Sequence, residues 1–133
     1  MAALKRIEVV AALIISEGRV LATQRGYGDG AGKWEFPGGK IEPGEEPHVA
    51  LQREIREELN MDITVGDLLH TIEYDYPAFH LSMQCYLCTP KQGNMRLLEH
   101  TDMCWADAAM LDTIDWLPAD WDIIPMLKAY LTA

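Results

Sequence analysis

The sequence predicts an α/β domain in which a mixed β-sheet is covered on both faces by helices. Apolar, β-branched segments typical of strands lie on both sides of one amphipathic segment, 47–60, whose periodicity is helical. A second helical segment, 120–131, lies near the end of the sequence. Strands in both halves around a central helix, followed by another helix, favour a layered helix–sheet–helix arrangement.

Length and composition indicate one globular domain, 1–133. The 133 residues suffice for one core and are too few for two ordinary domains, and 49% of them are hydrophobic. Residues 1–10 lack the apolar run of a signal peptide, and no apolar run approaches membrane-spanning length, so we expect a soluble, cytoplasmic protein. We expect a monomer, with a dimer as the alternative.

The acidic balance of the chain limits its partners. A net charge of −10 opposes the approach of DNA, RNA or an anionic membrane surface. We therefore expect no polymeric nucleic acid and no membrane partner. A small anionic substrate that arrives with a metal ion is compatible with this charge.

The first part of the chain predicts a hairpin and a loop. Residues 7–15 are β-branched and apolar almost throughout, which indicates a strand buried on both faces, and a turn at Glu17 and Gly18 leads into a second strand, 19–25. Residues 26–32 contain four glycines and lack the spacing of a dinucleotide-binding motif, so they predict a flexible loop. A short strand, 34–36, follows.

A glycine turn and a helix come next. The Pro-Gly-Gly sequence at 37–39 predicts a tight turn, because adjacent glycines reach backbone angles closed to other residues. Pro47 suits the first turn of a helix, and Glu45 and Glu46 favour the positive end of its dipole. The helix should therefore begin at 46–47.

The central helix has an apolar face and an acidic face. The apolar stripe contains Leu51, Ile55 and Leu59. The acidic face contains Glu54, Glu57 and Glu58. Three neighbouring carboxylates repel one another, and a divalent cation such as Mg²⁺ or Mn²⁺ would remove this repulsion. A metal site is one interpretation, and a solvated acidic face is the other.

The second half predicts further strands and a last helix. Residues 63–69 and 71–76 are extended, and 80–88 alternates as a half-buried strand, which places Cys85 and Cys88 on opposite faces. Because no second cysteine pair completes a zinc site, we expect structural or free thiols here rather than a zinc or redox pair. We expect a turn at 91–94 and a polar loop at 99–102. Asp107 can cap a short helix, and Asp120 is a plausible N-cap of the last helix, with Pro125 near its first turns.

The spacing of the polar residues in 39–61 resembles the Nudix box. Gly39 is followed after five residues by Glu45, and after seven more by Arg53 and Glu54. The remaining box positions are occupied by Ile55, Glu57, Glu58 and Met61. Asn60 stands where the family has glycine, and asparagine tolerates the left-handed conformation expected at that helix end.

The resemblance implies a fold and a metal site. The fold would be the Nudix fold, an α/β/α sandwich with a mixed sheet. The activity would be hydrolysis of a nucleoside diphosphate linked to another group. The metal would be bound by Glu54, Glu57, Glu58 and the Gly38 carbonyl. Arg53 would hold Glu45 in a bidentate pair.

The box contains no serine or cysteine nucleophile, so water is the expected attacking group. Glu99 lies six residues before Trp105, a spacing similar to MutT-type members in which a loop glutamate joins the metal site or serves as base. A solvated loop acid is the alternative. The sequence leaves open whether Glu54 or Glu99 accepts the proton.

Three further residues are candidates for binding the substrate. The resemblance to MutT-type sequences suggests that Arg25 and Phe36 line a base pocket, with core packing as the alternative for Phe36, and that Asp120 hydrogen-bonds the base. An ionised aspartate only accepts, so it would favour cytosine or 8-oxoguanine, which present a donor.

The whole chain is similar both to 8-oxo-dGTP diphosphatases and to CTP or dCTP pyrophosphohydrolases. This similarity implies release of a nucleoside monophosphate and pyrophosphate, with a role in cleansing the nucleotide pool and in DNA repair. The alternatives are a Nudix domain that binds nucleotides without cleaving them, a Nudix hydrolase of another substrate, and an acidic metal-binding protein.

Overall fold

A mixed β-sheet of seven strands forms the centre of the computed structural model, which describes residues 5–92 and 95–133. The strands are β1 (Lys5–Ser16), β2 (Arg19–Arg25), β3 (Trp34–Glu35), β4 (Gly38–Lys40), β5 (Asp62–Tyr76), β6 (Phe79–Gln92) and β7 (His100–Ala106). The order across the sheet is β3-β2-β1-β6-β5, with β4 paired to β1 and β7 paired to β2. β1 runs parallel to β6 and antiparallel to β2 and β4.

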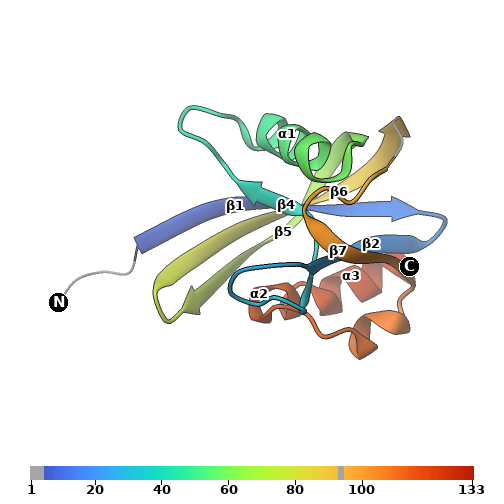
Figure 1. Cartoon of the computed structure of the whole chain (residues 1–133). Helices are drawn as coiled ribbons and strands as arrows, with labels where there is room; N and C mark the ends of the chain where they lie inside the picture. The colour runs from blue at the N-terminus through green and yellow to red at the C-terminus, as the bar shows by residue number, and fades with distance from the viewer. Residues whose placement is uncertain (1–4, 93–94) are drawn as a thin grey trace.

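Helices cover both faces of this sheet. They are α1 (Pro47–Leu59), the 3₁₀-helix η1 (Met110–Thr113), α2 (Pro118–Trp121) and α3 (Ile124–Leu131). α1 lies on one side of the sheet, and η1, α2 and α3 lie on the other (Figure 1). The predicted α/β architecture is therefore confirmed. None of the helices in the described ranges is long and apolar enough to cross a membrane.

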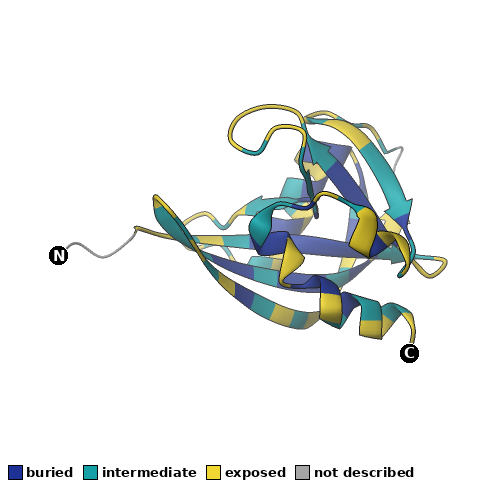
Figure 2. Cartoon of the chain, turned by 90° about the horizontal axis from the view of Figure 1, so that it is seen from below, coloured by how far each residue is buried: buried dark blue, intermediate teal, exposed yellow. Residues whose placement is uncertain are grey.

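β1 contributes to a core on each of its faces, as its unbroken apolar sequence predicts. Val10, Ala12 and Ile14 pack in the cluster that includes α1. Ala11 and Leu13 pack in the cluster that includes α2 and α3. Figure 2 shows the buried segments concentrated in the strands behind the C-terminal helices, whose outer surfaces are exposed.

The strand predicted at 80–88 is confirmed within β6, but the prediction that only one of its faces is buried is wrong. Met83 and Cys85 pack toward α2 and α3, but Tyr86 and Cys88 are buried as well, on the α1 side. α1 covers the face that the alternation indicated as solvent-facing. Cys85 and Cys88 do lie on opposite faces, as predicted, and both are free thiols.

The predicted tight turn at 37–39 is also wrong. Gly38 and Gly39 belong to β4, which pairs with β1, and neither has a positive φ. These positions need glycine because of close packing. A Cβ on Gly38 would lie 2.0 Å from the Val10 carbonyl oxygen, and one on Gly39 would lie 2.4 Å from Cδ of Glu54.

β7 replaces most of the polar loop predicted at 99–102. It begins at His100, because its backbone pairs with β2 and this pairing outweighs the polarity of the side chains. Asp107 is not the N-cap of η1, which is Ala109, but its Oδ1 accepts a hydrogen bond from the Met110 N–H at 3.0 Å across the turn that precedes this helix. Of the turn predicted at 91–94, residues 91–92 extend β6, and 93–94 lie outside the described residues.

The predicted last helix is divided into α2 and α3. Asp120 is not an N-cap: it lies within α2, whose N-cap is Leu117, and its Oδ2 accepts a hydrogen bond from the Phe36 N–H at 3.0 Å. Pro125 lies in the first turn of α3, as expected. The chain bends between the two helices around Ile123, which is fully buried.

α1 begins at Pro47 and ends before Asn60, which has the predicted left-handed conformation, with φ 53°. The left-handed conformation costs most residues about 1–2 kcal/mol. Asn60→Ala should therefore unfold at a lower denaturant concentration than Asn60→Gly, which avoids this cost. Chemical denaturation of the two variants tests this, and equal midpoints would contradict it.

Candidate functional site

The buried stripe of α1 fixes the direction in which its carboxylates face. Leu51, Ile55 and Leu59 are fully buried against the sheet. The adjacent acidic face therefore lies beside β4, where the position of Gly39 leaves room for the Glu54 carboxylate. The absence of a side chain at Gly39 lets the Glu54 carboxylate lie close to the backbone of this strand.

Arg53 organises the outer part of the acidic face. Its Nε and Nη2 each donate to one oxygen of Glu45 at 2.9 Å, which is the predicted bidentate pair. Its Nη1 lies 2.9 Å from Oε1 of Glu54 and 3.4 Å from Oε2 of Glu57. Arg53 therefore lowers the pKa of Glu45 and holds Glu54 in place.

Glu58 is the most strongly perturbed carboxyl of the box. It is 7% exposed, and burial together with the neighbouring Glu54 charge raises its pKa to about 9. Burial also raises the pKa of Glu54. Oε2 of Glu58 is buried and has no hydrogen-bond partner. Two neighbouring carboxylates, of which Glu58 is buried, are unfavourable in the ionised state unless a cation or a proton neutralises them.

A small hollow of about 120 Å³ lies beside Glu58. It is lined by Arg25, Tyr27, Glu35, Gly38, Glu58, Glu99 and His100. Glu99, the loop acid distant in sequence, is thus brought to the box, and its charge acts on Glu58. Within the described residues, three buried side-chain atoms lack a partner, and all three belong to residues of this hollow: Arg25 Nε, Glu58 Oε2 and His100 Nδ1.

The donor set of this region fits a hard divalent cation. Its carboxylate and carbonyl oxygens are the ligands that Mg²⁺ and Mn²⁺ prefer, and the unpartnered Glu58 oxygen is available. Over the described residues, no three acidic, histidine or cysteine side chains already stand close enough to hold an ion. Glu57 is 57% exposed at its side chain and is paired with Arg53. Glu57 would have to leave Arg53 to join Glu54, Glu58 and the Gly38 carbonyl.

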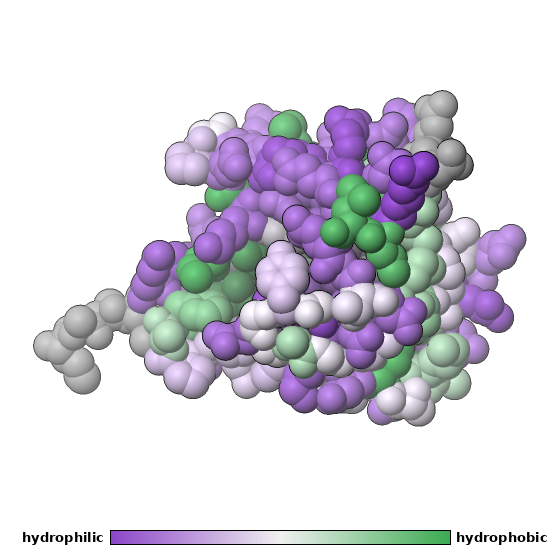
Figure 3. Space-filling view, in the orientation of Figure 1, coloured by the Kyte–Doolittle hydropathy of each residue, from purple (hydrophilic) through white to green (hydrophobic). Residues whose placement is uncertain are grey.

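A larger pocket of about 690 Å³ adjoins the acidic hollow, and both are lined by Arg25, Glu35 and Gly38. Apolar side chains line much of it, including Val9, Leu81 and Met83. In the space-filling view, apolar surface lies in a hollow below the strongly polar surface of α1 (Figure 3). The two adjoining cavities, one apolar and one acidic, can hold an amphipathic ligand.

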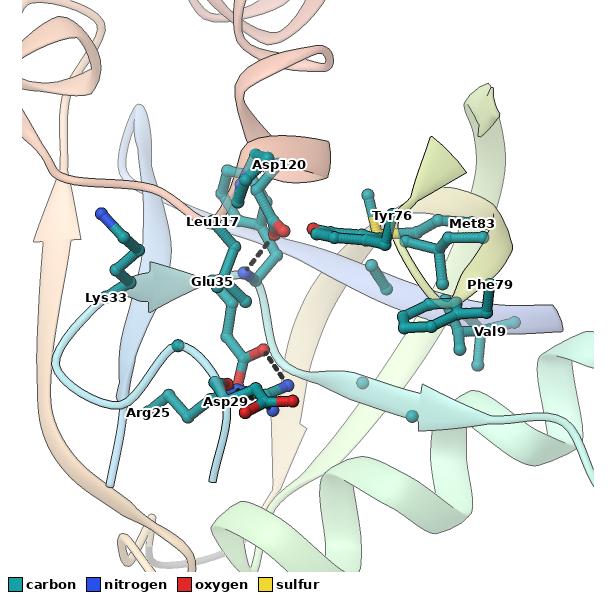
Figure 4. A pocket seen from close by; sticks show the side chains of 18 of the residues that line it. Val9, Arg25, Asp29, Lys33, Glu35, Tyr76, Phe79, Met83, Leu117 and Asp120 are labelled. Carbon is teal, nitrogen blue, oxygen red and sulfur yellow. Dashed lines mark hydrogen bonds and ion pairs between the residues drawn. The ribbon is translucent and has the colours of Figure 1, made fainter. Parts of the chain in front are cut away.

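All three predicted substrate-binding residues line this pocket: Arg25, Phe36 and Asp120. Phe36 is only 3% exposed, and its ring stacks on Trp116 at 4.5 Å, so it is mainly a core residue at the pocket wall. The rings of Tyr76 and Phe79, which are half-buried, offer more aromatic surface (Figure 4).

Burial opposes the ionised state that we expected for Asp120. It is 4% exposed, and this burial raises its pKa to about 8, against the opposing effect of the Phe36 N–H. When the Asp120 carboxyl group is protonated, it can donate as well as accept. The preference for donor-bearing bases does not follow from its charge.

Glu35 and His100 are site residues that sequence reasoning missed. Glu35 accepts from Arg25 Nη2 at 3.0 Å and lies 3.1 Å from Nε2 of His100, and these contacts lower its pKa despite its burial. The available signals were the position of Glu35 beside Phe36 and of His100 beside Glu99. Neither signal reveals that β2, β3 and β7 bring the three side chains together.

Known proteins resemble the chain over nearly its whole length. The family model described as the NUDIX domain matches residues 4–127. The CTP pyrophosphohydrolase of Escherichia coli (strain K12) is 36% identical over 129 residues, which covers 96% of this chain and 93% of that protein. The 8-oxo-dGTP diphosphatase of the same organism is 31% identical over 127 residues, covering 94% and 98%.

The fold is also that of a solved relative. The crystal structure of the MutT protein from Methanosarcina mazei Go1 matches with a TM-score of 0.86 at 24% identity, covering 100% of both chains. The box, the fold and the family match agree. The chain therefore belongs to the Nudix family of hydrolases, as the spacing of its box residues predicts.

Proposed function

We propose that this protein uses a divalent metal ion, Mg²⁺ or Mn²⁺, to hydrolyse nucleoside triphosphates to a nucleoside monophosphate and pyrophosphate. One observation carries the proposal: the apolar pocket and the acidic hollow share a wall formed by Arg25, Glu35 and Gly38. A nucleotide with its base in the larger pocket would place its phosphates beside Glu54 and Glu58. The names of the two relatives support the same reaction class.

The side chains of the site would have three roles in the reaction: binding the metal, positioning its ligands and accepting a proton. Glu54, Glu57, Glu58 and Glu99, with the Gly38 carbonyl, would hold the metal, which when bound lowers the pKa of a water and neutralises phosphate charge. Arg53 keeps Glu45 and Glu54 in position through its hydrogen bonds. Either Glu54 or Glu99 accepts the proton of the attacking water.

The substrate is a nucleoside triphosphate of the 8-oxo-dGTP class or of the CTP and dCTP class. A steady-state comparison of 8-oxo-dGTP, dGTP, CTP, dCTP and 5-methyl-dCTP, with products separated by chromatography, tests both the reaction and the base. Monophosphate and pyrophosphate are the expected products. Release of orthophosphate from every substrate would contradict the proposed bond cleavage.

The base should stack on Phe79, which lines the pocket and is half-buried. Phe79→Ala is expected to raise KM for nucleoside triphosphates about tenfold, which corresponds to about 1.4 kcal/mol, and to leave KM for inorganic tripolyphosphate unchanged. Phe36→Ala should raise KM for nucleotides too, but with a large loss of stability because its ring is buried. Tyr130→Ala, an exposed aromatic outside the pocket, is the control.

Asp120 should select among bases. Asp120→Ala is expected to change kcat/KM by different factors for the members of the nucleotide panel, because each base presents a different edge to this carboxyl group. The same factor for every nucleotide would mean that Asp120 only supports the backbone N–H of Phe36.

A further inference from the structure

Tyr76 is a rigid polar group in the larger pocket. Its ring stacks on Phe79, with centroids 5.1 Å apart, and lies 4.8 Å from the ring of Tyr74. Its hydroxyl oxygen accepts a hydrogen bond from the Ala119 N–H at 3.1 Å. Phe79 of β6 therefore fixes the position of the ring, and the Ala119 N–H of α2 fixes the position of the hydroxyl group.

The hydroxyl proton of Tyr76 has no acceptor among the residues that the structure describes. Burial and the neighbouring Asp120 raise the pKa of Tyr76, so the group stays protonated and can donate. Figure 4 shows the hydroxyl oxygen directed toward the Asp120 carboxyl group at one end of the pocket. Tyr76 and Asp120 thus present two adjacent polar groups on an otherwise mainly apolar wall.

We propose that the Tyr76 hydroxyl is a specificity-determining group, which donates a hydrogen bond to an acceptor of the nucleobase. The adjacent N–H of the base would donate to an oxygen of the Asp120 carboxyl group, which can accept in either protonation state. This inference rests on the proposed nucleotide function. The hydroxyl oxygen already accepts from the Ala119 N–H, and its proton remains available to donate to a ligand. Together, Tyr76 and Asp120 would then bind a base edge on which an N–H lies beside a hydrogen-bond acceptor.

Both candidate substrate classes present such an edge. In 8-oxoguanine, N7–H stands beside the O6 carbonyl, and in cytosine the N4 amine stands beside the acceptor N3. Two analogues keep the N–H and lose the acceptor. 8-Oxoadenine has an amine in place of O6, and 3-deazacytosine has a C–H in place of N3.

The test compares Tyr76→Phe with wild type and with Tyr74→Phe. The control removes a hydroxyl from the neighbouring ring, which does not line the pocket. Dissociation constants are measured by calorimetry in a metal chelator, so that no turnover is needed. The ligands are the monophosphates of 8-oxodeoxyguanosine, 8-oxodeoxyadenosine, deoxycytidine and 3-deazadeoxycytidine.

The nucleotides form two pairs, each consisting of a base with the acceptor and an analogue without it. In at least one pair, wild type and Tyr74→Phe should bind the nucleotide that has the acceptor more tightly than its analogue. Tyr76→Phe should weaken binding of that nucleotide about 3- to 10-fold and leave its analogue unchanged, because a neutral hydrogen bond contributes about 0.5–1.5 kcal/mol. If the hydroxyl only supports Ala119, both members of each pair weaken by the same factor, and the inference is wrong.

The failures of the two proposals are distinguishable. If Tyr76→Phe still binds the nucleotide with the acceptor more tightly than its analogue, by the same factor as wild type, the proposed role of the hydroxyl is wrong. The hydrolase proposal is unaffected by this result. If the wild-type protein binds none of the four nucleotides, the role of the hydroxyl is overturned, and turnover of the triphosphates with Mg²⁺ decides the hydrolase proposal separately. Tight, discriminating binding of the monophosphates, together with no hydrolysis of the corresponding triphosphates when Mg²⁺ is added, overturns the hydrolase proposal alone.

Discussion

Replacing Glu58 with glutamine is expected to reduce kcat at least about 100-fold while making the metal-free protein more stable at pH 8. Activity falls because the variant loses a proposed metal ligand. Stability rises because the folded protein buries Glu58 with a pKa of about 9, far above its ordinary value. Between the ordinary and the raised pKa the unfolded chain binds fewer protons, so this carboxyl group destabilises the fold as the pH rises.

Thermal unfolding in a chelator measures the second effect. The midpoint of Glu58→Gln should exceed that of wild type by at least about 3 °C at pH 8, the shift that about 1 kcal/mol produces in a domain of this size. The difference should vanish near pH 4.5. The matched variant is Glu57→Gln, whose side chain is exposed: it should lose a similar part of kcat, with stability unchanged or slightly raised. Near-normal turnover by either folded variant would contradict the proposed site.

Replacing each of the adjacent glycines Gly38 and Gly39 with alanine should have different effects on stability and activity. Gly38→Ala should destabilise the fold by about 3 kcal/mol or more, because the new Cβ would lie 2.0 Å from the Val10 carbonyl oxygen, and neither strand can move easily. Gly39→Ala should fold with a smaller loss, because its Cβ meets the end of the Glu54 side chain. It should nevertheless lose most of its activity, since Glu54 is displaced.

Denaturant unfolding and turnover, measured on both variants, separate these effects. An active Gly39→Ala would show that the position of Glu54 does not matter for the reaction. A Gly38→Ala variant as stable as wild type would contradict the close packing of β4 on β1.

Structural features that depend on residues close together in the sequence could be predicted from the sequence. The apolar run of β1 predicted burial on both faces, and the box spacing predicted the Arg53–Glu45 pair. Pro47 and Asn60 marked the two ends of α1 within one residue. These predictions depend on the chemistry and spacing of residues close in sequence, which a single chain displays directly.

Features set by distant pairing could not be predicted in this way. Gly38 and Gly39 have the composition of a turn, and only their pairing with β1 makes them a strand. Asp120 has the sequence context of an N-cap, but it lies beside Phe36, which is 84 residues away. The raised pKa of Asp120 follows from this burial, so its charge at pH 7 could not be read from its residue type.

Single turnover of a nucleoside triphosphate tests the central claim, that the carboxylates of α1 bind a metal ion that drives hydrolysis. Excess metal-free protein is mixed with a labelled nucleotide from the panel, with or without Mg²⁺, and the products are separated at successive times. We predict conversion to the monophosphate and pyrophosphate with Mg²⁺, an intact nucleotide in the chelator, and conversion at least about 100-fold slower with Glu58→Gln. A nucleotide that is bound by the wild-type protein and stays intact with Mg²⁺ would contradict the account and identify a binding domain.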